Sequence, residues 1–205
     1  MKQGIAKPVR ASDPPLGTGK AEIGASRSAL KRFRFVTAIL GIIFLAFAVV
    51  VGTRHTASTT SAYSPLLFHQ APNLSGETIN GSRASLAADR GHFVVVNFFA
   101  SWCVACRSEE PQLVNLLRTE GSSVRVLGVD FDDTAPLARR FLASYGASWP
   151  AISDTSGQIG LRWGVDEPPE SFLISPSGKV LTKIIGPVSA RQLEALITVA
   201  TLKGY

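Results

Sequence analysis

The sequence predicts an α/β domain, built on a mixed β-sheet flanked by helices and preceded by one N-terminal transmembrane helix. Apolar, β-branched segments alternate with segments of helical spacing, a pattern typical of parallel strands joined by crossover helices. A later pair of strands joined by a short turn adds antiparallel strands to the sheet. One long uncharged run near the N-terminus indicates the membrane helix. With 45% hydrophobic and 18% charged residues, the 205-residue chain is too apolar to be disordered.

The excess positive charge lies at the N-terminal end of the chain. Residues 1–34 hold eight Lys and Arg against two Asp and Glu, whereas the remainder holds thirteen of each kind, so the formal net charge of +6 belongs to the tail. A neutral domain is a poor phosphate-binding surface, so no nucleic-acid partner is expected. The two cysteines exclude a disulfide-dense miniprotein and any zinc site built from three or four thiolates.

The apolar run from Phe35 to Thr53 contains nineteen residues without a charge and is the predicted transmembrane signal anchor, residues 35–53. As a helix it would extend over about 28 Å, close to the hydrocarbon thickness of a bilayer. The basic cluster Lys31–Arg34 precedes it, so residues 1–34 are a predicted cytoplasmic tail and the domain is expected beyond the plasma (inner) membrane, in the periplasm. Two alternatives stay open: a cleaved signal peptide, for which Ser61-Ala62 offers small residues, and a buried core helix.

The predicted linker covers the polar residues 54–64, and the predicted domain covers residues 65–205. Residues 92–99 (HFVVVNFF) are β-branched and aromatic, which predicts a buried central strand. A helix from Cys103 to Gly121 follows, because apolar residues recur there at helical spacing and a glycine ends the pattern. Shorter pieces are expected before this strand: extended segments at 66–74 and 76–81 and a helical turn at 85–89.

The remaining segments continue the alternation. Residues 124–131 (VRVLGVDF) are apolar enough for a second buried strand, and residues 134–145 place apolar side chains on one face of a helix. Ser175-Pro176-Ser177-Gly178 has the composition of a hairpin turn. The other expected elements are an extended piece at 149–152, a short helix at 156–163, hairpin strands at 171–174 and 179–185, and a final helix at 189–202.

Both cysteines lie in the motif Trp102-Cys103-Val104-Ala105-Cys106, where the central strand passes into the following helix. A thiolate at a helix N-terminus is stabilised by unpaired N–H groups, so we expect Cys103 as a partly exposed nucleophile and Cys106 as a buried resolving thiol. Three other interpretations are weighed. Zinc would need further ligands near the pair, covalent haem attachment would need His where Arg107 stands, and an inert disulfide in so short a loop would add little stability.

Three motifs carry a family resemblance. Residues 97–107 (NFFASWCVACR) resemble the active-site segment of thioredoxin-fold proteins, and residues 169–174 (PESFLI) resemble the segment in which that family carries a cis proline facing the dithiol. A third set, residues 128–133 (GVDFDD) with Tyr145-Gly146 and Trp163-Gly164-Val165, is similar to the membrane-tethered CcmG/DsbE branch and its ResA/TlpA relatives. The resemblance covers about residues 65–200 and implies a thioredoxin fold.

The resemblance also implies an activity. Such a chain would be a protein dithiol–disulfide oxidoreductase, with a redox-active Cys103–Cys106 disulfide and neither a cofactor nor a metal. It would reduce apocytochrome c during cytochrome c maturation, drawing electrons from a membrane carrier such as DsbD or CcdA. Two alternatives stay open: a general envelope disulfide reductase or oxidase with other clients, and a tethered binding module whose disulfide is inert.

Further site residues follow from the same resemblance. Glu109 occupies the position of a glutamate that tunes thiol ionisation in the family, although a first-turn acid favoured by the helix dipole is an equally good interpretation. Trp102 is expected as a partly exposed platform for the client and Pro169 as the cis proline. Pro168 has no N–H, so we expect one main-chain hydrogen bond fewer to the client. Asn97 stands where thioredoxins often carry an ionisable aspartate.

Acidic residues follow the strand ends and loops at the expected rim of the site. As solvated side chains they would have no special role, and as rim charges they would favour basic clients. They are Asp130, Asp132, Asp133, Asp166, Glu167 and Glu170.

Overall fold

A computed structural model describes residues 27–53 and 60–205 of the chain. The chain divides into two compact units, Met1–His55 and Thr56–Tyr205. Most of the predicted basic tail (residues 1–26) and part of the predicted linker (residues 54–59) lie outside the described residues. What the sequence predicts for those stretches therefore stays a prediction.

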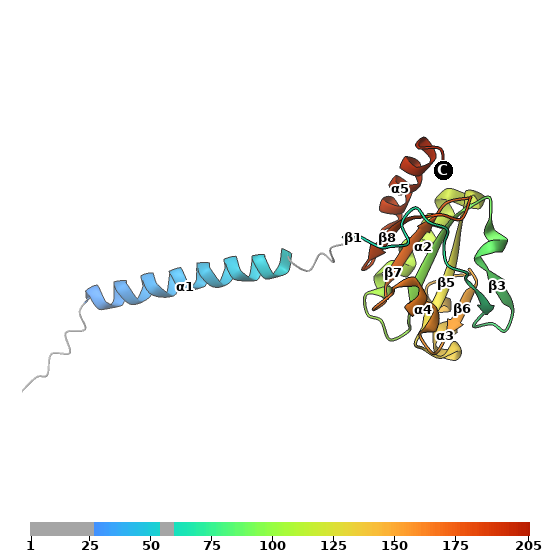
Figure 1. The fold of residues 1–205 in the computed structure, drawn as a ribbon. Coiled ribbons are helices and arrows are strands. Elements are labelled where there is room, and N and C mark those ends of the chain that lie inside the picture. The colour runs from blue at the N-terminus through green and yellow to red at the C-terminus, as the bar shows by residue number, and fades with distance from the viewer. Residues whose placement is uncertain (1–26, 54–59) are drawn as a thin grey trace, which may run out of the picture. The chain divides into compact units, whose positions relative to one another are not determined.

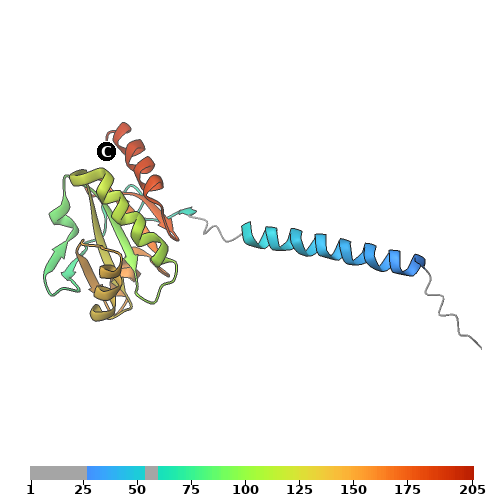
Figure 2. The same ribbon diagram turned by 180° about the vertical axis from the view of Figure 1, so that it is seen from behind.

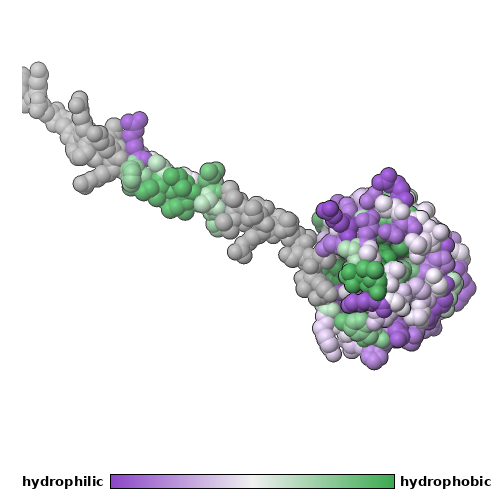
Figure 3. Space-filling model, turned by 90° about the horizontal axis from the view of Figure 1, so that it is seen from above, coloured by the Kyte–Doolittle hydropathy of each residue, from purple (hydrophilic) through white to green (hydrophobic). Residues whose placement is uncertain are grey.

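The first unit contains helix α1, Arg27–Thr53. Its described side chains belong to residues 34–47, and they are exposed and almost entirely apolar, with Arg34 as the charged residue at one end (Figure 3). Within the two described ranges, no helix is long and apolar enough to cross a membrane.

The second unit is built on a six-stranded sheet in the order β1-β8-β7-β4-β5-β6 (Figure 1). Strands β4, β5 and β6 run parallel to one another, whereas β7 is antiparallel to β4, β8 to β7 and β1 to β8. The mixed sheet and its antiparallel hairpin are therefore confirmed. The six strands are β1 Thr60–Ala62, β4 Phe93–Phe99, β5 Val124–Phe131, β6 Ala151–Asp154, β7 Glu170–Ile174 and β8 Val180–Ile185, and a separate antiparallel pair comprises β2 Ser75–Glu77 and β3 Arg83–Ser85.

Helices cover both faces of this sheet. Alternate side chains of β4 point to opposite faces and so belong to two different core clusters. Phe93, Val95 and Phe99 belong to one core cluster with residues of α2, α3 and α5, and α2 lies across this face (Figure 2). Val94, Val96 and Phe98 belong to a second cluster with residues of α4. The helices are α2 Cys106–Glu120, α3 Ala135–Ser144, α4 Gln158–Trp163 and α5 Ala190–Leu202, with 3-10 turns at Leu86–Asp89 and Gly121–Ser123.

One expectation for the start of the domain is wrong. The predicted linker contains strand β1, which pairs through its backbone with β8 from Thr60↔Ile185 to Ala62↔Lys183. Backbone pairing places no demand on side-chain polarity, so a polar segment can join a sheet edge. The stretch 66–74 contains no strand, and its contacts with the sheet are isolated bridges at Leu67 and Gln70.

Candidate functional site

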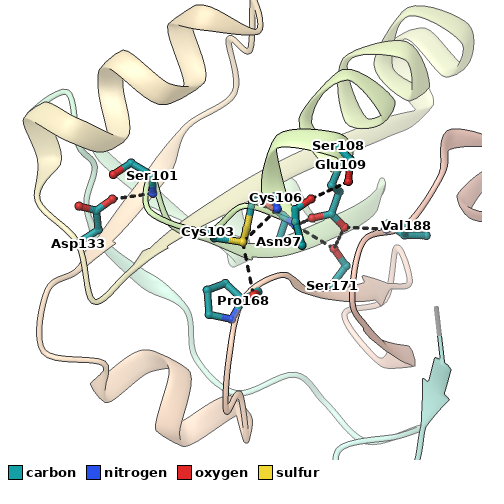
Figure 4. The surroundings of a disulfide bond; sticks show 11 residues. Asn97, Ser101, Cys103, Cys106, Ser108, Glu109, Asp133, Pro168, Ser171 and Val188 are labelled. Carbon is teal, nitrogen blue, oxygen red and sulfur yellow. Dashed lines mark hydrogen bonds between the residues drawn. A yellow bond between two sulfur atoms is a disulfide. The ribbon is translucent and has the colours of Figure 1, made fainter. Parts of the chain in front are cut away.

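The two cysteines lie where the central strand β4 passes into helix α2. Their sulfur atoms are joined in a disulfide, with an S–S distance of 2.05 Å (Figure 4). Every residue of β4 is buried, so the strand fixes the position of the loop that follows it. Cys106 is the first residue of α2 and is fully buried. The fold thus presents the dithiol pair at the carboxyl end of a rigid strand.

Cys103 differs from its sequence-based description in two ways. Helix α2 begins at Cys106, so Cys103 precedes the helix. Cys103 is also buried, with 4% of its surface exposed, where partial exposure was expected. The backbone N–H of Cys106 donates to Cys103 Sγ at 3.0 Å, so a helix N-terminal donor still reaches the sulfur. In the reduced chain such a donor favours the thiolate.

A second loop faces Cys103 from the opposite side. The Pro168–Pro169 peptide bond is cis, and the carbonyl oxygen of Pro168 lies 3.5 Å from Cys103 Sγ (Figure 4). Both prolines are buried. The structure therefore brings together the two loops in which the sequence predicted site residues.

Glu109 is fully buried and accepts three hydrogen bonds (Figure 4). Asn97 Nδ2 donates to Glu109 Oε2 at 2.9 Å, while Ser171 Oγ and the backbone N–H of Val188 donate to Glu109 Oε1 at 3.3 and 3.2 Å. Burial raises the pKa of Glu109 to about 7, although these hydrogen bonds act to lower it. Glu109 can therefore take up or release a proton near neutral pH.

Glu110, beside Glu109 on α2, is a buried carboxyl group that the sequence analysis missed. It is fully buried, and neither carboxylate oxygen has a hydrogen-bond partner among the described residues. Burial raises the pKa of Glu110 to about 8, and the neighbouring Glu109 carboxyl adds to the rise. The signal that could have found it is helical spacing, since Cys106, Glu110 and Leu113 share one buried face of α2.

The rim acids fall into two groups, so the interpretation as solvated side chains does not hold for all of them. Asp132, Asp166 and Glu167 are exposed, whereas Asp130, Asp133 and Glu170 are buried. Asp133 and Glu170 accept hydrogen bonds from backbone N–H groups, whereas the oxygens of Asp130 have no hydrogen-bond partner among the described residues.

Asp133 holds the cysteine loop in place. Its Oδ2 accepts from the backbone N–H of Ser101 at 2.7 Å, and its Oδ1 accepts from that of Thr134 at 2.6 Å (Figure 4). The loop is therefore connected to the start of α3 by one carboxylate.

Asp130 is a second buried acid near this loop. Burial, and then the negative charges of Asp133 and Asp154, raise the pKa of Asp130 to about 7.

Trp102 and Val104 form the exposed side of the cysteine loop, with 49% and 76% of their surfaces exposed. The indole Nε1 of Trp102 donates to the carbonyl oxygen of Asp132 at 3.2 Å, which orients the ring. The other two tryptophans, Trp149 and Trp163, are buried in the core. In the described part of the chain, no three His, Cys, Asp or Glu side chains are grouped so that they could hold a metal ion.

Comparisons with known proteins agree with this geometry. Residues 68–183 match the model of the AhpC/TSA family. The chain is 33% identical over 152 residues to the thiol:disulfide interchange protein DsbE of Allochromatium vinosum, covering 73% of this chain and 83% of that protein. It is 38% identical over 100 residues to the thiol:disulfide interchange protein HelX of Rhodobacter capsulatus, covering 48% of this chain and 55% of HelX. The match thus spans only about half the length of HelX.

A solved structure supports the fold. The crystal structure of a thiol:disulfide interchange protein of the thioredoxin family from Chlorobium tepidum superposes with a TM-score of 0.58 at 30% identity, covering 68% of this chain and 99% of that chain. The same thioredoxin-like arrangement of a mixed sheet and flanking helices is present here. The chain therefore belongs to the AhpC/TSA family and, within it, to the DsbE-type thiol:disulfide oxidoreductases.

Proposed function

We propose that this chain is an extracytoplasmic thiol:disulfide oxidoreductase that reduces the cysteines of apocytochrome c during cytochrome c maturation. The observation that carries the proposal is the Cys103–Cys106 disulfide at the strand-to-helix junction, with the buried Glu109 three residues further along α2. The names of the relatives, thiol:disulfide interchange proteins, support the same chemistry.

The reaction proceeds by two thiol–disulfide exchanges. The Cys103 thiolate attacks one sulfur of a client disulfide, a Cys103–client bond forms, and the other client sulfur leaves as a thiolate that takes up a proton. Cys106 then loses its proton and attacks the Cys103 sulfur, which closes the Cys103–Cys106 disulfide and releases the second client sulfur as a thiol. Two electrons pass from the chain to the client.

Glu109 is the proposed acceptor of the Cys106 proton. Residues three apart are neighbours on a helix surface, so Glu109 and Cys106 lie close along α2. Its pKa of about 7 matches the pH at which the transfer must occur. The hydrogen bonds from Asn97 and Ser171 hold the carboxyl group in place for that role.

The client is proposed to bind over the exposed side of the cysteine loop. Trp102 supplies a half-exposed aromatic surface there, and Pro168 and Pro169 form the opposing wall beside Cys103. Pro168 has a carbonyl oxygen that can accept a hydrogen bond but no N–H that can donate one, so an extended client has one main-chain partner fewer.

The chain is proposed to be anchored in the plasma membrane, with the domain in the periplasm. This proposal rests on the sequence of residues 31–53, in which a basic cluster precedes nineteen uncharged residues. Only the side chains of residues 34–47 in this stretch are described by the structure. A DsbD- or CcdA-like membrane thiol carrier would then re-reduce the Cys103–Cys106 disulfide after each turnover.

The test is the in-cell redox state of the two cysteines, read by thiol alkylation with and without the membrane electron donor. We expect a mostly reduced pair with the donor and an oxidised pair without it. A Cys106→Ser variant should trap apocytochrome c in a mixed disulfide, and a Cys103→Ser variant should not. A pair that stays oxidised in both strains would contradict the proposal, as would trapping of other envelope proteins alone.

The reduction potential separates the remaining alternatives. A potential well below about −200 mV is expected for a reductase, and one near about −120 mV would indicate an oxidase. Normal cytochrome c assembly with both cysteines changed to Ser, in a strain lacking other tethered thioredoxins, would indicate a binding module instead.

A further inference from the structure

A buried ion pair lies behind the loop that faces the dithiol. Lys183 Nζ is 2.7 Å from Glu170 Oε2, and the two side chains are 8% and 2% exposed. Glu170 opens β7 directly after Pro169, and Lys183 lies on the neighbouring strand β8. Burying two charges costs several kcal/mol of desolvation each, by order of magnitude, and an apolar pair of similar volume is often as stable. Stability alone therefore gives no reason for this pair.

Each of the two charged side chains also makes a hydrogen bond with the backbone of the segment that leads to Pro168. Glu170 Oε1 accepts from the backbone N–H of Asp166 at 3.3 Å, and Lys183 Nζ donates to the carbonyl oxygen of Gly164 at 2.5 Å. Lys183 Nζ also lies 5.7 Å from the centre of the Phe172 ring, which is a second contact with β7. Residues 164–166 are thus attached to two strands of the rigid sheet by the ion pair.

The segment 164–168 ends at Pro168, whose carbonyl oxygen faces the sulfur of Cys103. Pro168 O lies 3.5 Å from Cys103 Sγ, and the Cys106 N–H reaches the same sulfur at 3.0 Å. In the reduced chain the carbonyl oxygen can accept a hydrogen bond from a Cys103 thiol but repels a thiolate, whereas the N–H favours the thiolate. The distance of the carbonyl oxygen therefore helps to set how readily Cys103 ionises.

We propose that Glu170 and Lys183 are positioning residues, whose ion pair holds the 164–168 segment against Cys103 and thereby restrains the reactivity of this thiol. The inference rests on the proposed role of Cys103 as nucleophile. It concerns residues that touch neither the sulfur atoms nor the client. Loss of the pair should let the carbonyl oxygen move away and make Cys103 ionise at lower pH.

The test measures the pH dependence of iodoacetamide alkylation of Cys103 in the full chain carrying Cys106→Ser, which leaves a single thiol. Glu170→Gln and Lys183→Met should each move the midpoint to lower pH by about half a unit, which is about a threefold faster alkylation at a fixed pH below the midpoint. Lys183→Arg keeps the charge and should retain most of the original profile.

The two single variants separate positioning from simple electrostatics. Removing Glu170 takes away a negative charge and removing Lys183 a positive one, so a purely coulombic effect would move the two midpoints in opposite directions. Opposite shifts would therefore overturn the proposal. So would unchanged midpoints with a lowered melting temperature, since that result would indicate a structural role alone.

Two further variants complete the design. The double variant Glu170→Gln, Lys183→Met leaves no unpaired buried charge, so it remains informative if a single variant fails to fold, and it should show the same acidic shift. Glu77→Gln on β2 and Lys179→Met in the turn before β8 remove exposed charges outside the 164–168 segment as matched controls, and both should keep the original midpoint. Because alkylation requires no client, a negative result here leaves the test of the proposed function untouched.

Discussion

At the scale of single residues, two adjacent glutamates on α2 have opposite surroundings. Glu109 accepts hydrogen bonds from three donors, whereas the oxygens of Glu110 have no partner in the part of the chain that is described. Both are fully buried. Ionisation of Glu110 should therefore cost the fold more than ionisation of Glu109.

The first prediction concerns the pH dependence of stability. The folded-state pKa of Glu110, about 8, lies above its ordinary value of 4.5, so between these pH values the folded state holds a proton that the unfolded state releases. Stability should therefore fall as the pH rises from about 5 to 8. Glu109 and Asp130, whose pKa values are raised to about 7, contribute to the same fall, so Glu110→Leu should make it shallower without abolishing it and add about 2 kcal/mol at pH 8.

Denaturant unfolding at several pH values measures this effect. Glu77→Leu, which changes an exposed glutamate on β2, is the matched control and should keep the slope of the parent chain. If Glu110→Leu kept the same slope, Glu110 would not be the group that is protonated.

The second prediction concerns Pro168. Replacing it with Ala restores an N–H at the wall beside Cys103, so a client peptide trapped on the Cys106→Ser variant should bind more tightly by about 1 kcal/mol, roughly fivefold. The equilibrium constant of mixed-disulfide formation measures this gain. Pro176→Ala, in the turn between β7 and β8, is the control. Equal constants for Pro168→Ala and the parent would remove the argument.

The sequence predicted the residues proposed to carry the chemistry but did not predict their surroundings. Cys103 and Cys106 follow from the spacing of a local motif, and Glu109 follows from the resemblance of that motif to a family. The burial of Cys103 depends on the loop at Pro168, which is 65 residues away along the chain. No local pattern encodes such a contact.

At the scale of secondary-structure elements, the start of α2 is also a feature that the local sequence does not predict. Its N-cap residue is Ala105, which offers no side-chain cap, so the helix boundary is set by the loop before it. That loop is held by Asp133, through the hydrogen bond to Ser101. The strands and helices after residue 92 were predicted within a few residues because their apolar patterns are strong.

The third prediction tests the link between the cysteine loop and α3. Asp133→Ala removes the acceptor of both Ser101 N–H and Thr134 N–H, so we expect a loss of about 1–3 kcal/mol and faster hydrogen exchange at the Ser101 amide. Asp132→Asn is the control, because Asn also tolerates the positive φ of 46° at this position. Unchanged exchange at Ser101 would show that other contacts fix the loop.

At the scale of the whole molecule, charge and hydropathy divide the chain as the contacts do. The formal charge of +6 belongs to residues 1–34, and the two compact units are Met1–His55 and Thr56–Tyr205. The parallel and antiparallel strand pairings followed from the order of elements along the chain. The edge strand β1 did not, because its polar side chains carry no strand signal.

The fourth prediction concerns the anchor. The full chain should remain in the membrane fraction after alkaline carbonate extraction, and Ile42→Asp with Ile43→Asp should release it, since each central Asp costs about 2.5–3.5 kcal/mol of insertion free energy. The control places the same two charges at Thr56 and Ala57, in the predicted linker, and should stay membrane-bound. Release of the parent chain itself would contradict the anchor.

The pairing of β1 with β8 has a consequence for proteolysis. Scission of the chain just after Ala62 would remove β1 and leave β8 as the outermost strand, with its N–H and C=O groups on one side open to solvent. Bare strand edges recruit strands from other molecules. Trimmed protein should therefore self-associate more readily than the intact chain.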